Sequence, residues 1–115
     1  MRRVPAVLIL ALTAWQVGCA KQTTRQPAEP PVVLQVDNQN GLDMNIYVVE
    51  TSGARQRLGT AVAHTVANFR IPARLIFGIT PLRFQADPIG AGARPFTEQI
   101  TVEPGDTVVF RIPPG

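Results

Sequence analysis

Apolar residues recur at every second position in short runs from residue 32 onward, and this pattern constrains the fold more than any other feature. In the first run, Val32, Leu34 and Val36 occupy alternate positions. Successive side chains of a β-strand point to opposite faces, so such a run predicts a strand with one buried face. Comparable runs cover residues 42–49, 67–71, 82–86, 96–102 and 108–112, and residues 55–60, which follow a turn, are expected to add a further strand.

Turn-forming residues separate these runs. The 115 residues include 11 prolines and 9 glycines, and no segment shows a convincing helical period. About seven short strands with turn signals every 8–12 residues are typical of two packed antiparallel sheets. We therefore predict an all-β fold, in which residues 32–115 form a single small immunoglobulin-like antiparallel β-sandwich. A small barrel is the alternative architecture.

The first residues have the composition of a signal peptide. Arg2 and Arg3 precede an apolar run at residues 4–12, which is too short for a membrane-spanning helix of about 20 residues. We predict that residues 1–18 are a signal peptide and exclude them from the fold. Residues 19–31 contain three prolines and no large apolar side chain, which predicts a disordered tether.

Cys19 is the only cysteine of the chain and directly follows the apolar segment, in Val17-Gly18-Cys19-Ala20. This segment resembles the lipobox of bacterial lipoproteins. The resemblance implies that the Cys19 thiol carries a diacylglyceryl group, including palmitate, which anchors the protein in a membrane. Because Ala20 and not Asp follows Cys19, it also implies the periplasmic face of the outer membrane. The alternative is ordinary cleavage, which would give a secreted or soluble periplasmic protein.

Charge argues against nucleic acid as a partner. The formal net charge of +3 includes Arg2 and Arg3 of the predicted leader, and residues 32–115 contain seven arginines and seven carboxylates. Nucleic-acid binding needs a clustered excess of positive charge. We therefore expect no nucleic acid as a partner. The predicted lipid on Cys19 implies a membrane as a partner, and we expect another envelope protein as a further one.

Two internal turns have specific signals. Asn40-Gly41 lies between the first two runs and, because both residues tolerate positive φ, predicts a tight hairpin. Residues 51–53 predict a second turn.

Residues 102–110 resemble the hairpin V-x-P-G-D-x-V-x-F of bacterial immunoglobulin-like domains and cupredoxins. Cupredoxins need two histidines and a cysteine for copper, whereas this chain has only His64 and the lipobox cysteine.

Few residues support chemistry. The only serine, Ser52, and the only histidine, His64, show no motif of nucleophilic catalysis, so we predict no enzyme and no cofactor. Asp37, Asn40 and Asp43 could form a calcium site, although their spacing does not fit an EF-hand, and a turn is the alternative. We therefore predict no metal site.

The candidate interaction residues are Leu75, Ile76, Phe77 and Tyr47. The first three belong to an apolar run at residues 72–81 that breaks the alternation, and it either covers the end of the core or docks another envelope protein. Tyr47 is the one aromatic ring expected to face outward, where it could bind a sugar. These features favour a non-catalytic structural or protein-interaction module. The alternative is a periplasmic binder of a small ligand or ion, or an enzyme accessory subunit, favoured by a cluster of Tyr47, Arg55 and Arg57.

Radiolabelled palmitate should enter the wild-type chain and not the Cys19→Ser variant, because the variant lacks the thiol that would receive the lipid. Autoradiography of bacteria that express each chain measures the incorporation. A wild-type chain that stays unlabelled and fully soluble would contradict lipid attachment.

Overall fold

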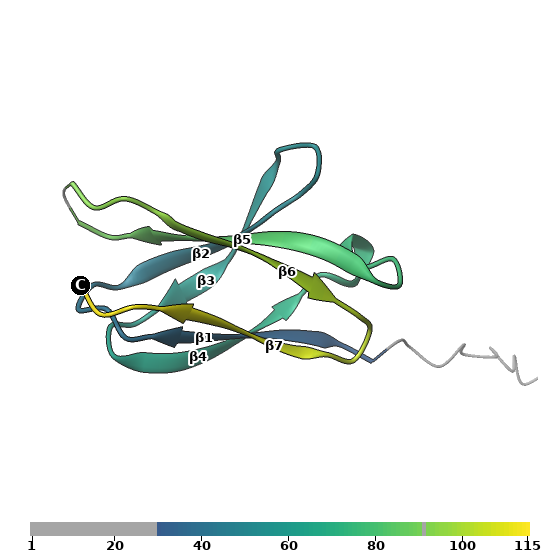
Figure 1. The fold of residues 1–115 in the computed structure, drawn as a ribbon, viewed down its shortest axis with the longest axis horizontal. Helices are drawn as coiled ribbons and strands as arrows, with labels where there is room; N and C mark the ends of the chain where they lie inside the picture. Colours follow the sequence, from purple (N-terminus) through teal and green to yellow (C-terminus); the bar gives the residue numbers. More distant parts are fainter. Residues whose placement is uncertain (1–29, 91) are drawn as a thin grey trace, which may run out of the picture.

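The computed structural model describes residues 30–90 and 92–115 (Figure 1). The predicted signal peptide (1–18), Cys19 and the predicted tether up to residue 29 lie outside the described residues. The elements are β1 (Val32–Asn38), β2 (Met44–Val49), β3 (Arg55–Ala61), β4 (Thr65–Ile71), the 3₁₀ helix η1 (Ala73–Leu75), β5 (Thr80–Pro88), β6 (Phe96–Val102) and β7 (Thr107–Ile112). No helix in this part of the chain has the length and apolar character to cross a membrane.

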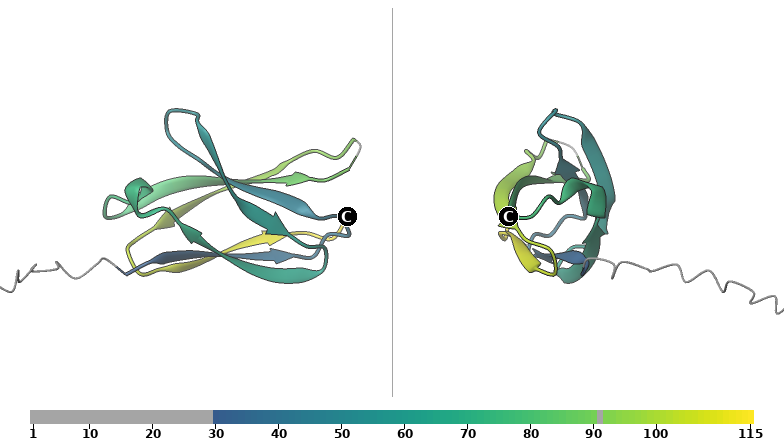
Figure 2. Two further views of the ribbon diagram at one scale, coloured as in Figure 1. Left: turned by 180° about the vertical axis from the view of Figure 1, so that it is seen from behind. Right: turned by 90° about the vertical axis from the view of Figure 1, so that its right-hand side faces the viewer.

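The strands form two sheets that pack face to face (Figures 1 and 2). One sheet has the order β4-β1-β7 and the other the order β3-β2-β5-β6. Every pairing is antiparallel except that of β1 with β7, which is parallel. The prediction of an all-β sandwich of about seven strands is therefore confirmed, and the parallel pair is the one departure from its antiparallel pattern.

The likeness to immunoglobulin domains is one of architecture. Antibody constant domains place their strands in the orders 1-2-5-4 and 3-6-7. Here β2 and β5 are also neighbours, but β1 lies in the opposite sheet, between β4 and β7. Seven strands in two packed sheets are common to both arrangements, and the paths between the sheets differ.

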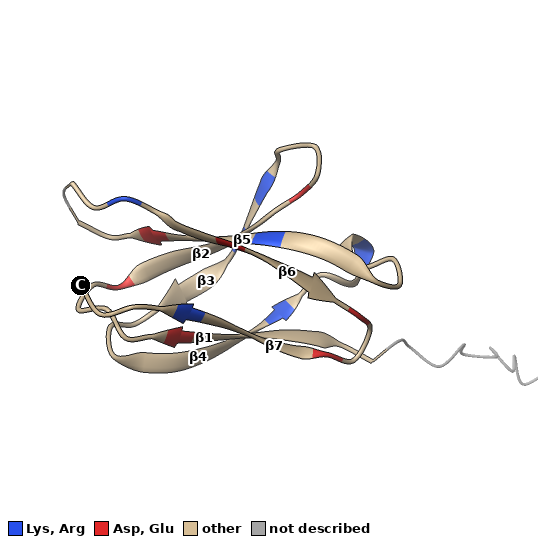
Figure 3. Cartoon of the chain, in the orientation of Figure 1, with Lys and Arg blue, Asp and Glu red and all other residues tan. Residues whose placement is uncertain are grey.

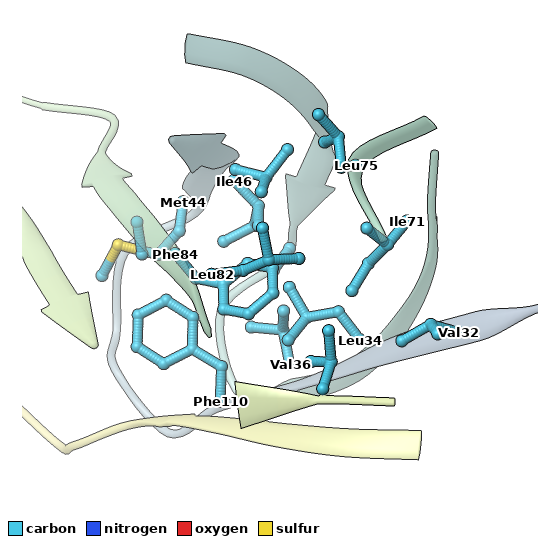
Figure 4. Close-up of a cluster of buried hydrophobic side chains, with 14 of the residues drawn as sticks. Val32, Leu34, Val36, Met44, Ile46, Ile71, Leu75, Leu82, Phe84 and Phe110 are labelled. Carbon is cyan, nitrogen blue, oxygen red and sulfur yellow. The ribbon is translucent and has the colours of Figure 1, made fainter. Parts of the chain in front are cut away.

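Alternation along the strands builds the core. Every second residue of β1, β2 and the middle of β5 is buried, while the residues between them are half-buried or exposed. The inward side chains of the two sheets meet in one cluster (Figure 4). Its fully buried members are Val32, Leu34, Val36, Met44, Ile46, Val48, Ala61, Ile71, Phe84, Ala86, Val102, Phe110 and Ile112.

At one margin of the sandwich, the edge strands β3 and β4 approach each other. Gly59 of β3 lies beneath the ring of Phe69, and a Cβ placed on Gly59 would come within 2.5 Å of Phe69 Cε1. Phe69 packs against the core from this edge position. The missing side chain of Gly59 therefore gives the ring the space it needs to close the margin.

Most connections pass from one sheet to the other. Of the six connections, only β2–β3 and β5–β6 stay within a sheet. The hairpin predicted at Asn40-Gly41 is therefore wrong, because β1 and β2 lie in different sheets. Among the described residues, positive φ outside glycine occurs only at His64, so Asn40 does not adopt the conformation that a tight hairpin turn requires.

The motif at residues 102–110 also forms a corner. Asp106 N donates to Glu103 O at 3.0 Å, and Gly105 has φ of 89°. These features are typical of the predicted turn. The flanking strands, however, pair elsewhere: β6 with β5, and β7 with β1. The turn is confirmed, and the hairpin pairing across it is wrong.

The buried amide of Asn38 joins two of the crossings. This side chain is 1% exposed at the end of β1. Its Nδ2 donates to the carbonyl oxygens of Leu42 at 3.0 Å, Ala61 at 3.1 Å and Val62 at 3.3 Å. Its Oδ1 accepts a hydrogen bond from Asn40 N at 3.0 Å. One side chain therefore holds the β1–β2 crossing against the β3–β4 crossing.

Asn40 extends this connection to the last strand. It is 6% exposed, and its Oδ1 accepts from Leu42 N at 3.0 Å. Its Nδ2 donates to Pro113 O at 3.3 Å, just beyond β7. These bonds explain why the Asn-Gly pair forms a corner: both asparagine side chains satisfy backbone groups that a hairpin ladder would otherwise pair.

Asn38→Ala should lower the free energy of unfolding by about 2–4 kcal/mol, because the buried carbonyl group of Ala61 and the buried N–H of Asn40 would lose their partners. Urea denaturation followed by circular dichroism measures the change. Asn68→Ala is the matched control, since Asn68 is exposed on β4, and we expect a change within about 0.5 kcal/mol. Equal stabilities of the two variants would contradict the role of the Asn38 amide.

Candidate functional site

The sandwich has two ends with different surfaces. At the first, here called the tether end, the described chain begins: Pro30 O accepts from Gly105 N at 3.1 Å, and Val33 N donates to Asp106 O at 2.9 Å. The β4–β5 crossing lies at this end as well (Figure 1). The opposite end, here called the distal end, contains the β1–β2 and β3–β4 crossings and the C-terminus (Figures 1 and 2).

The apolar run at residues 72–81 is divided between core and surface. Leu75 and Ile76 are each 8% exposed and belong to the core cluster, whereas Phe77 is 79% exposed. Figure 4 shows Leu75 at the edge of the buried cluster. The first two residues therefore cover the end of the core, as one of the two sequence interpretations expected. Of the three proposed docking residues, only Phe77 remains available at the surface.

Ile79 joins Phe77 on this surface with an exposed fraction of 70%. A short turn holds the two side chains out. Thr80 Oγ1 accepts from Phe77 N at 2.8 Å and donates to Gly78 O at 3.3 Å. Gly78 has φ of 63°, which favours glycine. We call Phe77, Gly78 and Ile79 the apolar turn.

Two shallow hollows flank the apolar turn. One has a volume of about 300 Å³ and lies between the turn and the tip of the β2–β3 hairpin. The other, of about 250 Å³, lies where Pro30 and Pro31 approach Ile76 and Pro104. The hairpin is fixed to η1 through an ion pair between Glu50 and Arg74, with Oε1 and Nη1 2.6 Å apart. The apolar turn thus lies beside a hairpin that this ion pair links to η1.

The distal end has a larger apolar hollow, with a volume of about 490 Å³. Its lining includes Leu42 and Phe96, which are far apart in the sequence. Pro88 and Pro95 contribute further apolar surface. Arg94 is the one charged side chain among the described residues that line it. Leu42 is 38% exposed and belongs to the β1–β2 crossing. Its carbonyl oxygen accepts the hydrogen bond from Asn38 that fixes this crossing.

Tyr47 lies on the outer face of the four-stranded sheet, as predicted, and the fold brings Arg55 and Asp87 to it. The Arg55 guanidinium carbon is 4.5 Å from the centre of the Tyr47 ring, and Arg55 Nη1 is 3.1 Å from Asp87 Oδ2. Arg57 Nη2 donates to Asn45 Oδ1 at 3.1 Å and to Thr60 Oγ1 at 2.6 Å. The cluster expected for ligand binding is thus assembled, but its charged groups bond to one another and to neighbouring strands.

Charged residues are spread over both sheets. Figure 3 shows that basic and acidic positions occur on the strands of both sheets. Three ion pairs connect neighbouring parts of the described surface: Arg55–Asp87, Arg74–Glu50 and Arg111–Asp37. This distribution gives no electrostatic basis for an extended polyanion.

The three oxygen-bearing residues proposed for calcium serve other partners. Asp37 Oδ2 accepts from Gln39 Nε2 at 3.0 Å, and Asp43 Oδ1 accepts from Ala63 N at 2.8 Å. Asn40 Oδ1 is bonded to Leu42 N. Within residues 30–90 and 92–115, no three His, Cys, Asp or Glu side chains gather into a potential metal site.

Ser52 and His64 lie far apart. Ser52 is in the β2–β3 turn and His64 in the β3–β4 turn, so β3 separates them. Seven strand residues at about 3.3 Å per residue span roughly 23 Å. Since the sequence has no other serine or histidine, this chain cannot form a Ser–His pair within one molecule.

Sequence reasoning missed the distal hollow and the exposure of Ile79. A signal for a turn at this point was present, because glycine readily adopts the positive φ that many turns require. No comparable signal existed for the hollow, whose walls come from segments more than 40 residues apart. No protein-family model, curated protein or solved structure matches the chain.

Millimolar calcium should leave the melting temperature unchanged, because the oxygens of Asp37, Asn40 and Asp43 already accept hydrogen bonds within the fold. Differential scanning calorimetry with and without calcium measures the shift, with magnesium as the control. A rise in melting temperature that Asp43→Asn abolishes would contradict this.

Proposed function

We propose that the protein is a membrane-anchored envelope lipoprotein that acts as a non-catalytic protein-interaction module. Cys19 would carry the lipid, and residues 20–31 would connect it to the sandwich. The observation that carries the interaction role is the apolar hollow of about 490 Å³ at the distal end. The anchor itself rests on the lipobox-like sequence around Cys19.

The direction of the chain supports this arrangement. The described residues begin at the tether end, where Pro30 is bonded to the β6–β7 turn. A lipid on Cys19 would hold this end nearest to the membrane. The distal end would then face away from the bilayer, where another envelope protein could reach it.

The chemistry of the hollow indicates what kind of partner it would accept. Leu42, Pro88 and Phe96 provide apolar walls, and Arg94 adds one positive charge. Apolar pockets with a few polar groups at their rim are common recognition sites. We expect the partner to insert an apolar side chain that lies next to an acidic residue.

A catalytic role has less support. The single serine and histidine are separated by the length of β3, and the lipid would occupy the only thiol. Asp87 is paired with Arg55, and Asp106 Oδ2 accepts from Glu103 N at 2.8 Å. These groups have structural partners in place of the converging arrangement that acid–base catalysis uses.

The alternative is a periplasmic binder of a small ligand. Its specific support is the cluster of Tyr47, Arg55 and Arg57 on the outer sheet face, near a hollow of about 320 Å³ lined by Arg83 and Gln99. Arg55 and Arg57 already bond to Asp87, Asn45 and Thr60, so part of their donor capacity is used within the fold. We therefore favour the interaction module.

A photoreactive amino acid in place of Leu42 should crosslink the protein to a discrete partner in intact bacterial envelopes. The same probe in place of Val109 is the control, because Val109 is 44% exposed on β7, outside the lining of the hollow. Immunoblotting of the higher-mass adduct measures the contact. Arg94→Glu should reduce the adduct about tenfold or more, since it would repel the expected acid.

The Arg94→Glu chain must retain its melting temperature for this comparison to be valid, which is expected because Arg94 is exposed. Equal crosslinking from positions 42 and 109, or an adduct that Arg94→Glu leaves intact, would contradict docking at the distal hollow. Palmitate incorporation at Cys19 tests the anchor separately.

A further inference from the structure

We infer that the apolar turn, Phe77, Gly78 and Ile79, is a contact for the surface of the lipid bilayer that orients the anchored domain. This inference rests on the proposed anchoring through Cys19. It assigns the turn to lipid and not to the envelope protein that the sequence suggested for Phe77. The distal hollow is left for the protein partner.

Phe77 and Ile79 are the two most exposed large apolar side chains of the described residues. Their exposed fractions are 79% and 70%, against 54% for Val66, the next highest. Both project from one turn. Aromatic and aliphatic side chains on such a projection suit insertion into the boundary between headgroups and acyl chains, which reaches about 5–10 Å deep.

The exposure is built into the turn. On one side, Leu75 and Ile76 are buried and fix the chain to the core. On the other, Thr80 begins β5 and bonds to both Phe77 N and Gly78 O. The two apolar side chains therefore cannot withdraw into the core without the loss of these contacts, and both remain available for an apolar contact.

The length of the tether and its point of attachment to the domain indicate that the bilayer lies close to the apolar turn. Twelve residues separate Cys19 from Val32, and a coil of this length spans roughly 20 Å on average. Pro30 and the apolar turn belong to the same end of the sandwich, since Ile76 lines one hollow together with Pro30. A lipid on Cys19 would therefore keep the turn within reach of the bilayer.

Tethering also makes a weak contact sufficient. Two apolar side chains alone bind a bilayer weakly, but the tether makes their insertion an intramolecular event with a high effective concentration. A protein docking on the same turn would have to fit between the domain and the membrane. Lipid is the occupant that the geometry favours.

Charge supports an apolar contact over an electrostatic one. The nearest basic residues in the sequence are Arg74 and Arg83, and Arg74 is paired with Glu50. The nearby β6–β7 turn, however, contributes Glu103 and Asp106. We therefore expect little dependence on salt or on anionic lipid.

Tryptophan fluorescence can test the contact directly, because the only tryptophan, Trp15, lies in the predicted signal peptide. The probe is the lipidated Phe77→Trp chain, extracted from bacterial envelopes and reconstituted in vesicles of phosphatidylcholine with brominated acyl chains. The matched control is Ile89→Trp, since Ile89 is 49% exposed next to the distal end of β5. Bromine quenches tryptophan only at short range. Mass spectrometry of each chain measures the lipid on Cys19.

We expect the emission at position 77 to shift to shorter wavelength and to be quenched at least about twofold more than at position 89. Ile79→Ser in the Phe77→Trp chain should reduce this quenching. Equal quenching at both positions, or none at position 77 in a chain with lipid on Cys19, would overturn the bilayer contact. A chain without lipid on Cys19 would overturn the anchor on which the inference rests. A crosslink from position 77 to a protein, without quenching, would assign the turn to a protein partner.

Discussion

The hydrogen bonds of Asn38 are the interaction on which the arrangement of the two sheets most depends. β1 ends at Asn38, and the chain there leaves one sheet for the other. Its amide binds carbonyl groups of both neighbouring crossings, and Asn40 continues the connection to the end of β7. A buried amide with all its groups bonded specifies one geometry, because each alternative would leave polar groups unsatisfied.

This arrangement gives the two ends of the sandwich different properties. At the distal end, the bonded crossings hold Leu42 at the rim of an apolar hollow. At the tether end, the β4–β5 crossing buries Leu75 and Ile76 and leaves Phe77 and Ile79 outside. Both surfaces therefore follow from connections that pass between the sheets. The proposed roles, a protein contact at one end and a lipid contact at the other, use this polarity of the domain.

Much of the fold was predictable, and the candidate site was predictable only in part. The alternation of apolar residues identified six of the seven strands near their observed bounds, because side-chain direction in a strand is a local property. The remaining strand, β3, has no such alternation and was expected from the turn that precedes it. Partner choice is not local. Asn40-Gly41 has the composition of a hairpin turn, yet Asn38 and Asn40 bond to groups as far away as Ala61 and Pro113. Similarly, residues 72–81 were recognised as unusual, but their division between core and surface depended on the position of β5.

The sequence by itself determined that this protein is built from strands, roughly where they lie, and that Cys19 stands alone after an apolar segment. These properties depend on each residue and its near neighbours. Only the tertiary structure decided which strands pair, that β1 runs parallel to β7, and that Phe77 and Ile79 project beside the start of the described chain. Those outcomes depend on contacts between distant segments, whose free energy arises only when both sheets close on a common core.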